Sequence, residues 1–411
     1  PMVKVSLTVY VLITQVGTYE LGNSLRAIGG NQVKRLILVL LALMLLVPRV
    51  SHASAPPEIS SIAYLLYDAD FGRVLVEKNG FERRSIASIT KVMTILYAVE
   101  LIEQGKISLA DKITASARAE SREGTQIKLR AGETFTVEEL LYAAALQSAN
   151  DAAVVLAEYI GGSEEQFAAM MNERARELGL EDTNYVDCTG LLSIFSGNYS
   201  TAYDQARLFS TAMGHELFRE IFGSEKYFLQ AQRREIKNSH PLLGEVDGVE
   251  GGKTGATTPA GHTLITSTTR RGRRLISVVL GARTREARNA ESESLIEWAF
   301  DQLQVVIPKD TTLTTMEVPD GVRHEIGVTI DRDVSIFAIG EDPENLTTEV
   351  ILDKSLRAPI DRGEVVGELI LYSSDGSEYG RMPVVAQHST GLASWLRRIY
   401  NRLILFLRRV F

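Results

Sequence analysis

The chain has 411 residues, of which 45% are hydrophobic and 23% charged, and its formal net charge at pH 7 is -8. This composition is typical of a globular protein with about two or three domains, and the acidic balance argues against general nucleic-acid binding, which needs a basic surface. Cys188 is the only cysteine, which excludes an intramolecular disulfide, and the six histidines include no i,i+4 pair of the kind that binds zinc.

Residues 1–53 carry an N-terminal extension followed by the pattern of a secretory signal peptide. Basic residues precede the apolar run 36–47, and Ser51 and Ala53 have the small side chains expected before a cleavage site at Ser54. An uncleaved membrane anchor is the alternative, although a run of about a dozen residues is short for a span that needs roughly 20. We therefore expect an exported protein at the outer face of the bacterial cytoplasmic membrane.

Residues 56–304 combine strand and helix patterns, which predicts one α/β domain. Two β-runs meet at a turn of Asp and Gly, helical periodicity follows, and a later pair of β-runs around a basic turn precedes a closing helix. The expected elements are strands within 59–80, helices at 88–105, 136–162 and 163–180, a strand hairpin within 261–283 and a helix at 285–303.

The predicted secondary structure changes after residue 304. Residues 305–386 alternate short β-runs with turn clusters, which predicts a small all-β domain. Residues 387–411 form an amphipathic helix at ~100° per residue, with Leu, Ile, Phe and Trp395 on one face and Arg with Asn401 on the other; Leu405 is the one misfit. Such a cationic helix is typical of a segment that lies in a membrane surface, and a core-packed terminal helix is the alternative.

Ser88 and Lys91 form a Ser-x-x-Lys pair at the start of a predicted helix. A chain of this length contains about one or two such pairs by chance, so the pair alone indicates only a solvated helix start. On a helix, however, both side chains share a face. The lysine amine could then activate the serine hydroxyl, which is a poor nucleophile without a base, provided that desolvation or a neighbouring cation lowers the lysine pKa.

Two further motifs follow along the chain. Lys253-Thr254-Gly255 precedes a β-run, where it offers a cation, a hydroxyl and room for a substrate backbone; a plain strand-entry turn is the alternative. Ser-x-Asn occurs at 148–150 and again at 196–198. The first copy interrupts two apolar helical runs and is favoured, because the second lies in a segment that resembles a loop.

In chain order the motifs are S-x-x-K, S-x-N and K-T-G, the active-site signature of serine enzymes that react with penicillin. The blocks "SITKVMT", "LLYAAALQSANDAAVVLAEYIGG" and "GVEGGKTGATTPAGHTLI" resemble, in the same order, those of the low-molecular-weight penicillin-binding proteins that are D-alanyl-D-alanine carboxypeptidases. The likeness covers roughly residues 58–390. It implies a catalytic domain with helices around an antiparallel sheet, followed by a small all-β domain and a C-terminal amphipathic helix.

The resemblance implies a serine-type D-Ala-D-Ala carboxypeptidase, a hydrolase that removes the terminal D-alanine from peptidoglycan stem pentapeptides during cell-wall remodelling. It needs no metal or organic cofactor, and β-lactams inhibit it by acylating the same serine. By their match to the motifs, Ser88 resembles the acylated nucleophile, Lys91 its proton acceptor and Ser148 the relay to the leaving amine. The residues implied to bind substrate are Asn150, Lys253, Thr254 and Arg283, and the backbone N–H groups of Ser88 and Ala256 would form the oxyanion hole.

One loop departs from the family's sequence pattern, and two other classes of protein share part of the motif set. The family's Asn-Pro-His-Gly-Leu-like loop is replaced by "VDCTGLL", with Cys188 and Thr189 in place of proline and histidine, which puts substrate reach and rate in doubt. A class A-type β-lactamase has the same three motifs, but no Glu-x-x-Leu-Asn stretch for deacylation lies between Asn150 and Lys253. A wall-binding or scaffolding protein with a decayed site is the other alternative, and the intact motif residues argue against it.

Overall fold

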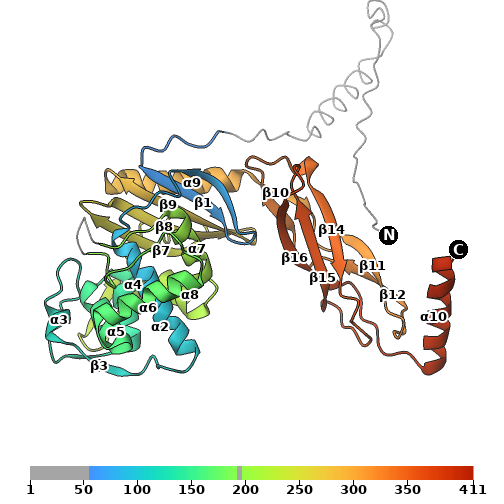
Figure 1. Ribbon diagram of the computed structural model, residues 1–411, viewed down its shortest axis with the longest axis horizontal. Coiled ribbons are helices and arrows are strands. Elements are labelled where there is room, and N and C mark those ends of the chain that lie inside the picture. Colours follow the sequence, from blue (N-terminus) through green and yellow to red (C-terminus); the bar gives the residue numbers. More distant parts are fainter. Residues whose placement is uncertain (1–54, 192–196, 411) are drawn as a thin grey trace, which may run out of the picture.

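The structure, a computed structural model, describes residues 55–191 and 197–410 (Figure 1). The predicted signal segment 36–47 and its cleavage site lie outside the described residues. A domain of mixed helices and strands is followed by an all-β domain, and the two lie side by side, with the last helix beyond the second domain (Figure 1).

A five-stranded antiparallel sheet forms the centre of the first domain. Its strand order is β2-β1-β9-β8-β7, so the N-terminal hairpin pairs with strands from the end of the domain. The strands are β1 (Ala63–Asp68), β2 (Arg73–Lys78), β7 (Val249–Thr257), β8 (Gly261–Arg270) and β9 (Arg273–Ala282). β1 is buried along its whole length, because helices cover both faces of the sheet.

Alternate residues of the sheet enter two hydrophobic cores. Helix α9 (Arg285–Asp301) packs on one face, where Leu295 and Phe300 join Leu66 of β1. The opposite face, with Leu65 of β1, packs against the other helices of the domain, including the central helix α2 (Lys91–Glu103) (Figure 1). The sheet thereby fixes β7, its edge strand, beside the start of α2.

The remaining elements of the first domain connect these layers, and several helices begin at residues that cap them. Thr136 and Glu139 form a reciprocal capping box at the start of α4, and Ser163 caps α6. The elements are η1 (Ala87–Thr90), β3 (Lys112–Thr114), α3 (Ala117–Glu120), β4 (Thr134–Thr136), α4 (Val137–Leu146), α5 (Asn150–Gly161), α6 (Glu164–Glu177), α7 (Ala202–Ala212), α8 (Glu216–Gly223), β5 (Lys226–Leu229) and β6 (Arg234–Lys237).

The second domain is built from short strands around its own core. A five-stranded antiparallel sheet has the order β11-β12-β16-β15-β14, and β10 pairs with β13 beside it. Its core includes Val328, Val366 and Leu371. The elements are β10 (Leu303–Ile307), β11 (Thr312–Glu317), β12 (Glu325–Thr329), β13 (Val334–Phe337), η2 (Pro343–Asn345), β14 (Thr347–Leu352), β15 (Val365–Tyr372) and β16 (Glu378–Ala386).

The two domains meet at a buried arginine. Arg273 of β9 pairs with the buried Asp68 carboxylate and donates to the backbone carbonyl of Ser335 in the second domain. Its guanidinium carbon lies 4.0 Å from the centroid of the Phe71 ring. The same ring packs so closely on Gly380 that a side chain at this glycine would overlap it. These contacts join the sheet of the first domain directly to the β-domain.

Helix α10 (Trp395–Val410) contacts the β-domain along one narrow side. Asn401 is fully buried and donates from Nδ2 to the carbonyl oxygens of Pro319 (3.1 Å) and Gly321 (2.8 Å). Leu405, one turn later, is also buried, so the apparent misfit of the helical pattern is a contact residue. Asn401 lies on the arginine side of the helix, as predicted, and this side faces the β-domain, where Arg402 pairs with Asp320 and Arg408 with Glu325.

Candidate active site

Ser88 and Lys91 lie where the short 3-10 helix η1 leads into α2. Ala87 has φ 48°, a left-handed conformation that turns the chain sharply before Ser88. Lys91 Nζ donates to Ser88 Oγ at 3.0 Å and to the Thr189 carbonyl oxygen at 3.0 Å. The structure brings the predicted nucleophile and base into contact, although on a 3-10 turn rather than within one α-helix.

Burial makes Lys91 suitable as a base. Its side chain is fully buried, and this burial is the main reason that its pKa falls from 10.5 to about 8. The Arg122 guanidinium lowers the same pKa, while Asp187 and Asp151 raise it. The pKa of Lys253 also lies well below its ordinary value, because of burial first and the Lys91 charge next. A pKa of about 8 leaves a minor fraction of the Lys91 amine neutral at pH 7, and this fraction can accept a proton.

Ser148 and Asn150 occupy the tight turn between α4 and α5. Ser148 is buried with φ 56°, and Asn150 Nδ2 donates to the Glu123 carbonyl oxygen at 2.8 Å. Among the described residues, Ser148 Oγ and Asn150 Oδ1 are buried without a hydrogen-bond partner. Buried polar atoms are normally paired. These two atoms are therefore available to a bound molecule.

The third motif, Lys253-Thr254-Gly255, lies on strand β7 beside Ser88. Lys253 is buried and its Nζ donates to the Thr254 carbonyl oxygen at 3.0 Å. A Cβ at Gly255 would lie 3.0 Å from the Ser88 backbone nitrogen, so this position needs glycine to leave the space beside the serine free. Ala256 follows at an open hollow at the edge of the sheet. The hollow is lined by Ala256, Thr257, Thr258, Gly261, His262 and Arg283.

The atypical loop contributes its backbone to the site. The Thr189 carbonyl is an acceptor for Lys91, and Asp187 Oδ1 accepts from the backbone nitrogens of Thr189 and Gly190, each at 2.6 Å. Cys188 is buried, and burial raises the pKa of its thiol well above the ordinary value, so the thiol is no nucleophile. The sequence contains no signal for these roles, because they depend on backbone groups far from the motifs.

The second Ser-x-Asn copy supports this loop. Asn198 accepts from the Val186 backbone nitrogen at 2.7 Å and donates to Thr90 Oγ1 and the Asp187 carbonyl oxygen, each at 3.0 Å. Ser196 lies outside the described residues. The Asn198 amide thus supports the chain behind η1, and among the described residues of the two copies the buried atoms without a partner are Ser148 Oγ and Asn150 Oδ1.

This arrangement is suited to nucleophilic acyl transfer. A serine hydroxyl lies beside a buried amine, a second hydroxyl is unpartnered, and a hollow with an arginine lies at the end of the neighbouring strand. In the part of the chain that the structure describes, no cluster of His, Cys, Asp and Glu side chains could hold a metal ion.

Comparison with known proteins agrees with this chemistry. Residues 50–284 match the family described as D-alanyl-D-alanine carboxypeptidase, and residues 302–390 match the C-terminal domain of penicillin-binding protein 5. The D-alanyl-D-alanine carboxypeptidase DacF of Bacillus subtilis is 35% identical over 343 residues, which cover 81% of this chain and 87% of that protein.

Two solved structures are similar to the fold. Penicillin binding protein 5 from Haemophilus influenzae has a TM-score of 0.64 and 28% identity, covering 82% of this chain and 99% of that one. Penicillin-binding protein D2 from Listeria monocytogenes, in an ampicillin-bound form, has a TM-score of 0.55 and 29% identity, covering 59% and 100%. The predicted fold class and serine-hydrolase activity are confirmed. The chain belongs to the D-alanyl-D-alanine carboxypeptidases, the low-molecular-weight penicillin-binding proteins.

Proposed function

We propose that this carboxypeptidase removes the terminal D-alanine from peptidoglycan stem pentapeptides through an acyl-enzyme on Ser88. The contact between Lys91 Nζ and Ser88 Oγ, at 3.0 Å, is the observation that carries the proposal. A serine hydroxyl needs an adjacent base, and Lys91 is buried with a pKa lowered to about 8. A minor fraction of such an amine is neutral at physiological pH and can accept a proton.

In the first step Lys91 Nζ takes the Ser88 hydroxyl proton while Ser88 Oγ forms a bond to the carbonyl carbon of the penultimate D-alanine. The carbonyl oxygen becomes an oxyanion, which the backbone N–H groups of Ser88 and Ala256 stabilise. Ser148 passes a proton to the nitrogen of the terminal D-alanine as the peptide bond breaks. Water then attacks the ester, which releases the shortened peptide and restores the Ser88 hydroxyl.

Substrate binding uses the remaining motif residues. The terminal carboxylate lies against Thr254 and Arg283, and Lys253 adds positive potential beneath them. The Asn150 side chain binds the peptide backbone with the Oδ1 atom that has no partner among the described residues. A β-lactam presents a reactive carbonyl and a carboxylate in a similar arrangement, so it acylates Ser88 and inhibits the enzyme.

The C-terminal helix attaches the protein to a membrane surface. Exposed apolar side chains cover the side of α10 that points away from the β-domain, and Trp395 is 63% exposed. Such a face with neighbouring arginines suits the interface of an anionic bilayer. None of the helices among the described residues is long and apolar enough to cross a membrane. The apolar side of α10 consists of Trp395, Leu396, Ile399, Leu403, Phe406 and Leu407, and Leu392 is exposed just before the helix.

We also propose export to the outer face of the cytoplasmic membrane, which the signal pattern of residues 34–54 supports. Mass spectrometry of a synthetic stem pentapeptide incubated with the protein tests the activity directly. The expected product is the tetrapeptide together with free D-alanine. An unchanged pentapeptide in the presence of folded protein, or cleavage at another bond, would contradict the proposal.

A further inference from the structure

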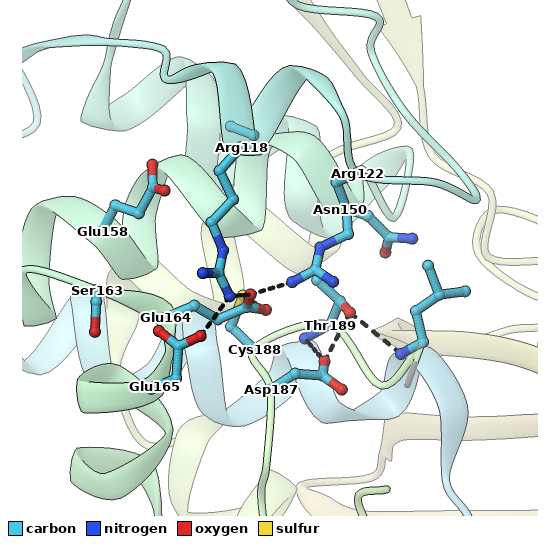
Figure 2. A network of polar contacts seen from close by, with 12 residues as sticks. Arg118, Arg122, Asn150, Glu158, Ser163, Glu164, Glu165, Asp187, Cys188 and Thr189 are labelled. Atoms are coloured by element: carbon cyan, nitrogen blue, oxygen red, sulfur yellow. Dashed lines mark hydrogen bonds and ion pairs between the residues drawn. The ribbon is translucent and has the colours of Figure 1, made fainter. Parts of the chain in front are cut away.

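A buried carboxylate lies behind the active site. Glu164, the first residue of α6, has a side chain that is only 2% exposed. Its Oε2 atom accepts from Arg118 at 2.9 Å and from Arg122 in a shorter contact. Figure 2 shows both guanidinium groups converging on this carboxylate. A buried ion pair loses hydration and is weak evidence for stability. The Glu164 carboxylate is also connected to two segments that form the active site.

One connection leads to the catalytic lysine. Glu164 Oε1 accepts a hydrogen bond from Cys188 Sγ at 3.4 Å. The next residue, Thr189, provides the carbonyl oxygen that accepts from Lys91 Nζ at 3.0 Å. Gly190 then packs directly on the Ala87 carbonyl, with no room for a side chain. The carboxylate thus holds residues 187–190, which form the Lys91 side of the site.

The other connection leads to the substrate-binding asparagine. Arg122 is held by Glu164 and begins the segment 122–125. The Glu123 carbonyl oxygen accepts from Asn150 Nδ2 at 2.8 Å, and the Thr125 carbonyl oxygen accepts from the Asn150 backbone nitrogen at 2.7 Å. This segment forms the Asn150 side of the site. One carboxylate therefore links the two sides, which are 66 residues or so apart in the chain, through Arg122 and Cys188.

We propose that Glu164 is a positioning residue that ties the Lys91 side of the site to the Asn150 side and, by pairing with Arg122, sets the charge around the Lys91 amine. The proposal rests on the role of Lys91 as the base. The other groups that face Lys91 are Ser88 from η1, Asp187 and Cys188 from the loop 187–190, Asp151 from α5 and Lys253 from β7. None of these is changed by the substitutions below.

The charge arrangement predicts opposite effects for the two partners. Arg122→Gln removes a cation and leaves Glu164 less neutralised, so the pKa of Lys91 rises. Glu164→Gln leaves the Arg122 cation without its main counter-charge, so the pKa of Lys91 falls. The double variant removes both charges and returns the pKa toward that of the parent. A purely structural role would loosen the site in both single variants and would not produce shifts of opposite sign.

The experiment measures the second-order rate of acylation by a fluorescent penicillin between pH 5 and pH 10 for the full chain and the three variants. Acylation rises with pH as Lys91 loses its proton, and the midpoint of this rise is the readout. We expect the midpoint to rise by about half a pH unit in Arg122→Gln and to fall by about half a pH unit in Glu164→Gln. In the double variant it should return toward the midpoint of the parent. At pH values below the midpoint, a shift of half a pH unit changes the acylation rate about threefold.

The matched control is Glu173→Gln on the same helix, since this exposed carboxylate pairs with Arg176 and lies far along the outer side of α6. Its midpoint should equal that of the parent. Thermal unfolding shows whether each variant is folded. If Glu164→Gln does not fold, the proposal is tested by whether the midpoint rises in Arg122→Gln. Unmoved midpoints, or shifts of the same sign in both single variants, overturn the proposal. Acylation that persists in those cases leaves the role of Ser88 intact.

Discussion

Replacing Lys91 by methionine should abolish activity and yet stabilise the catalytic domain at neutral pH. The fall of the Lys91 pKa from 10.5 to about 8 on folding corresponds to about 3 kcal/mol of lost stability below pH 8. Between these two values the unfolded state binds more protons, so the stability of the parent rises with pH and the loss disappears above about pH 10.5. Methionine has a similar volume and no charge to bury.

The substitution also removes two hydrogen bonds, to Ser88 Oγ and to the Thr189 carbonyl, which are worth about 1 kcal/mol each. Lys91→Met should therefore be about 1 kcal/mol more stable than the parent at pH 7 and about 2 kcal/mol less stable at pH 11. Urea unfolding at both pH values measures these differences. The exposed Lys106→Met serves as the control.

The reversal between pH 7 and pH 11 is the decisive part of this result. A variant that is equally stable relative to the parent at both pH values would show that Lys91 carries no burial cost. The pKa of the amine would then lie near 10.5 in the folded enzyme, almost none of it would be neutral at pH 7, and the proposed proton transfer from Ser88 would lose its base.

Two further predictions concern the substrate and the membrane. If Thr254 and Arg283 bind the terminal carboxylate, an amidated stem peptide should lose at least about tenfold in kcat/KM, since a charge-assisted hydrogen bond is worth about 1.5 to 3 kcal/mol; equal rates on acid and amide would exclude this role. Trp395→Ser with Phe406→Ser should release the protein from anionic vesicles in a sedimentation assay, with hydrolysis of a soluble peptide unchanged, and raised salt should weaken attachment of the parent. Undiminished sedimentation of this double variant would show that α10 is not the anchor.

The catalytic motifs could be predicted from the sequence because each is a short run whose chemistry depends on residues three apart or less. Ser88 and Lys91 meet as expected. The predicted helix that holds them is in fact a 3-10 turn followed by α2, because the left-handed Ala87 tightens the chain at that point. Periodicity alone does not distinguish the two forms over a single turn.

Contacts between distant segments could not be predicted in this way. Thr189 reaches Lys91 through a backbone carbonyl 98 residues further along the chain, and any residue type provides such a group. The pairing of Glu164 with Arg122 depends on how α6 packs against a loop. Leu405 is the misfit of the amphipathic pattern and Asn401 belongs to its arginine side, and the contacts of both with the β-domain could not be predicted from the helix alone. Tertiary packing, rather than local pattern, decides each of these positions.

The most direct test of the central claim is the site of covalent labelling. The full chain is incubated with a labelled penicillin, digested, and mapped by peptide mass spectrometry, in parallel with Ser88→Ala. The mechanism predicts a single adduct on the peptide that contains Ser88, and neither label nor turnover in the Ser88→Ala variant. An adduct on any other residue, or continued release of D-alanine by folded Ser88→Ala protein, would contradict the assignment of Ser88 as the nucleophile.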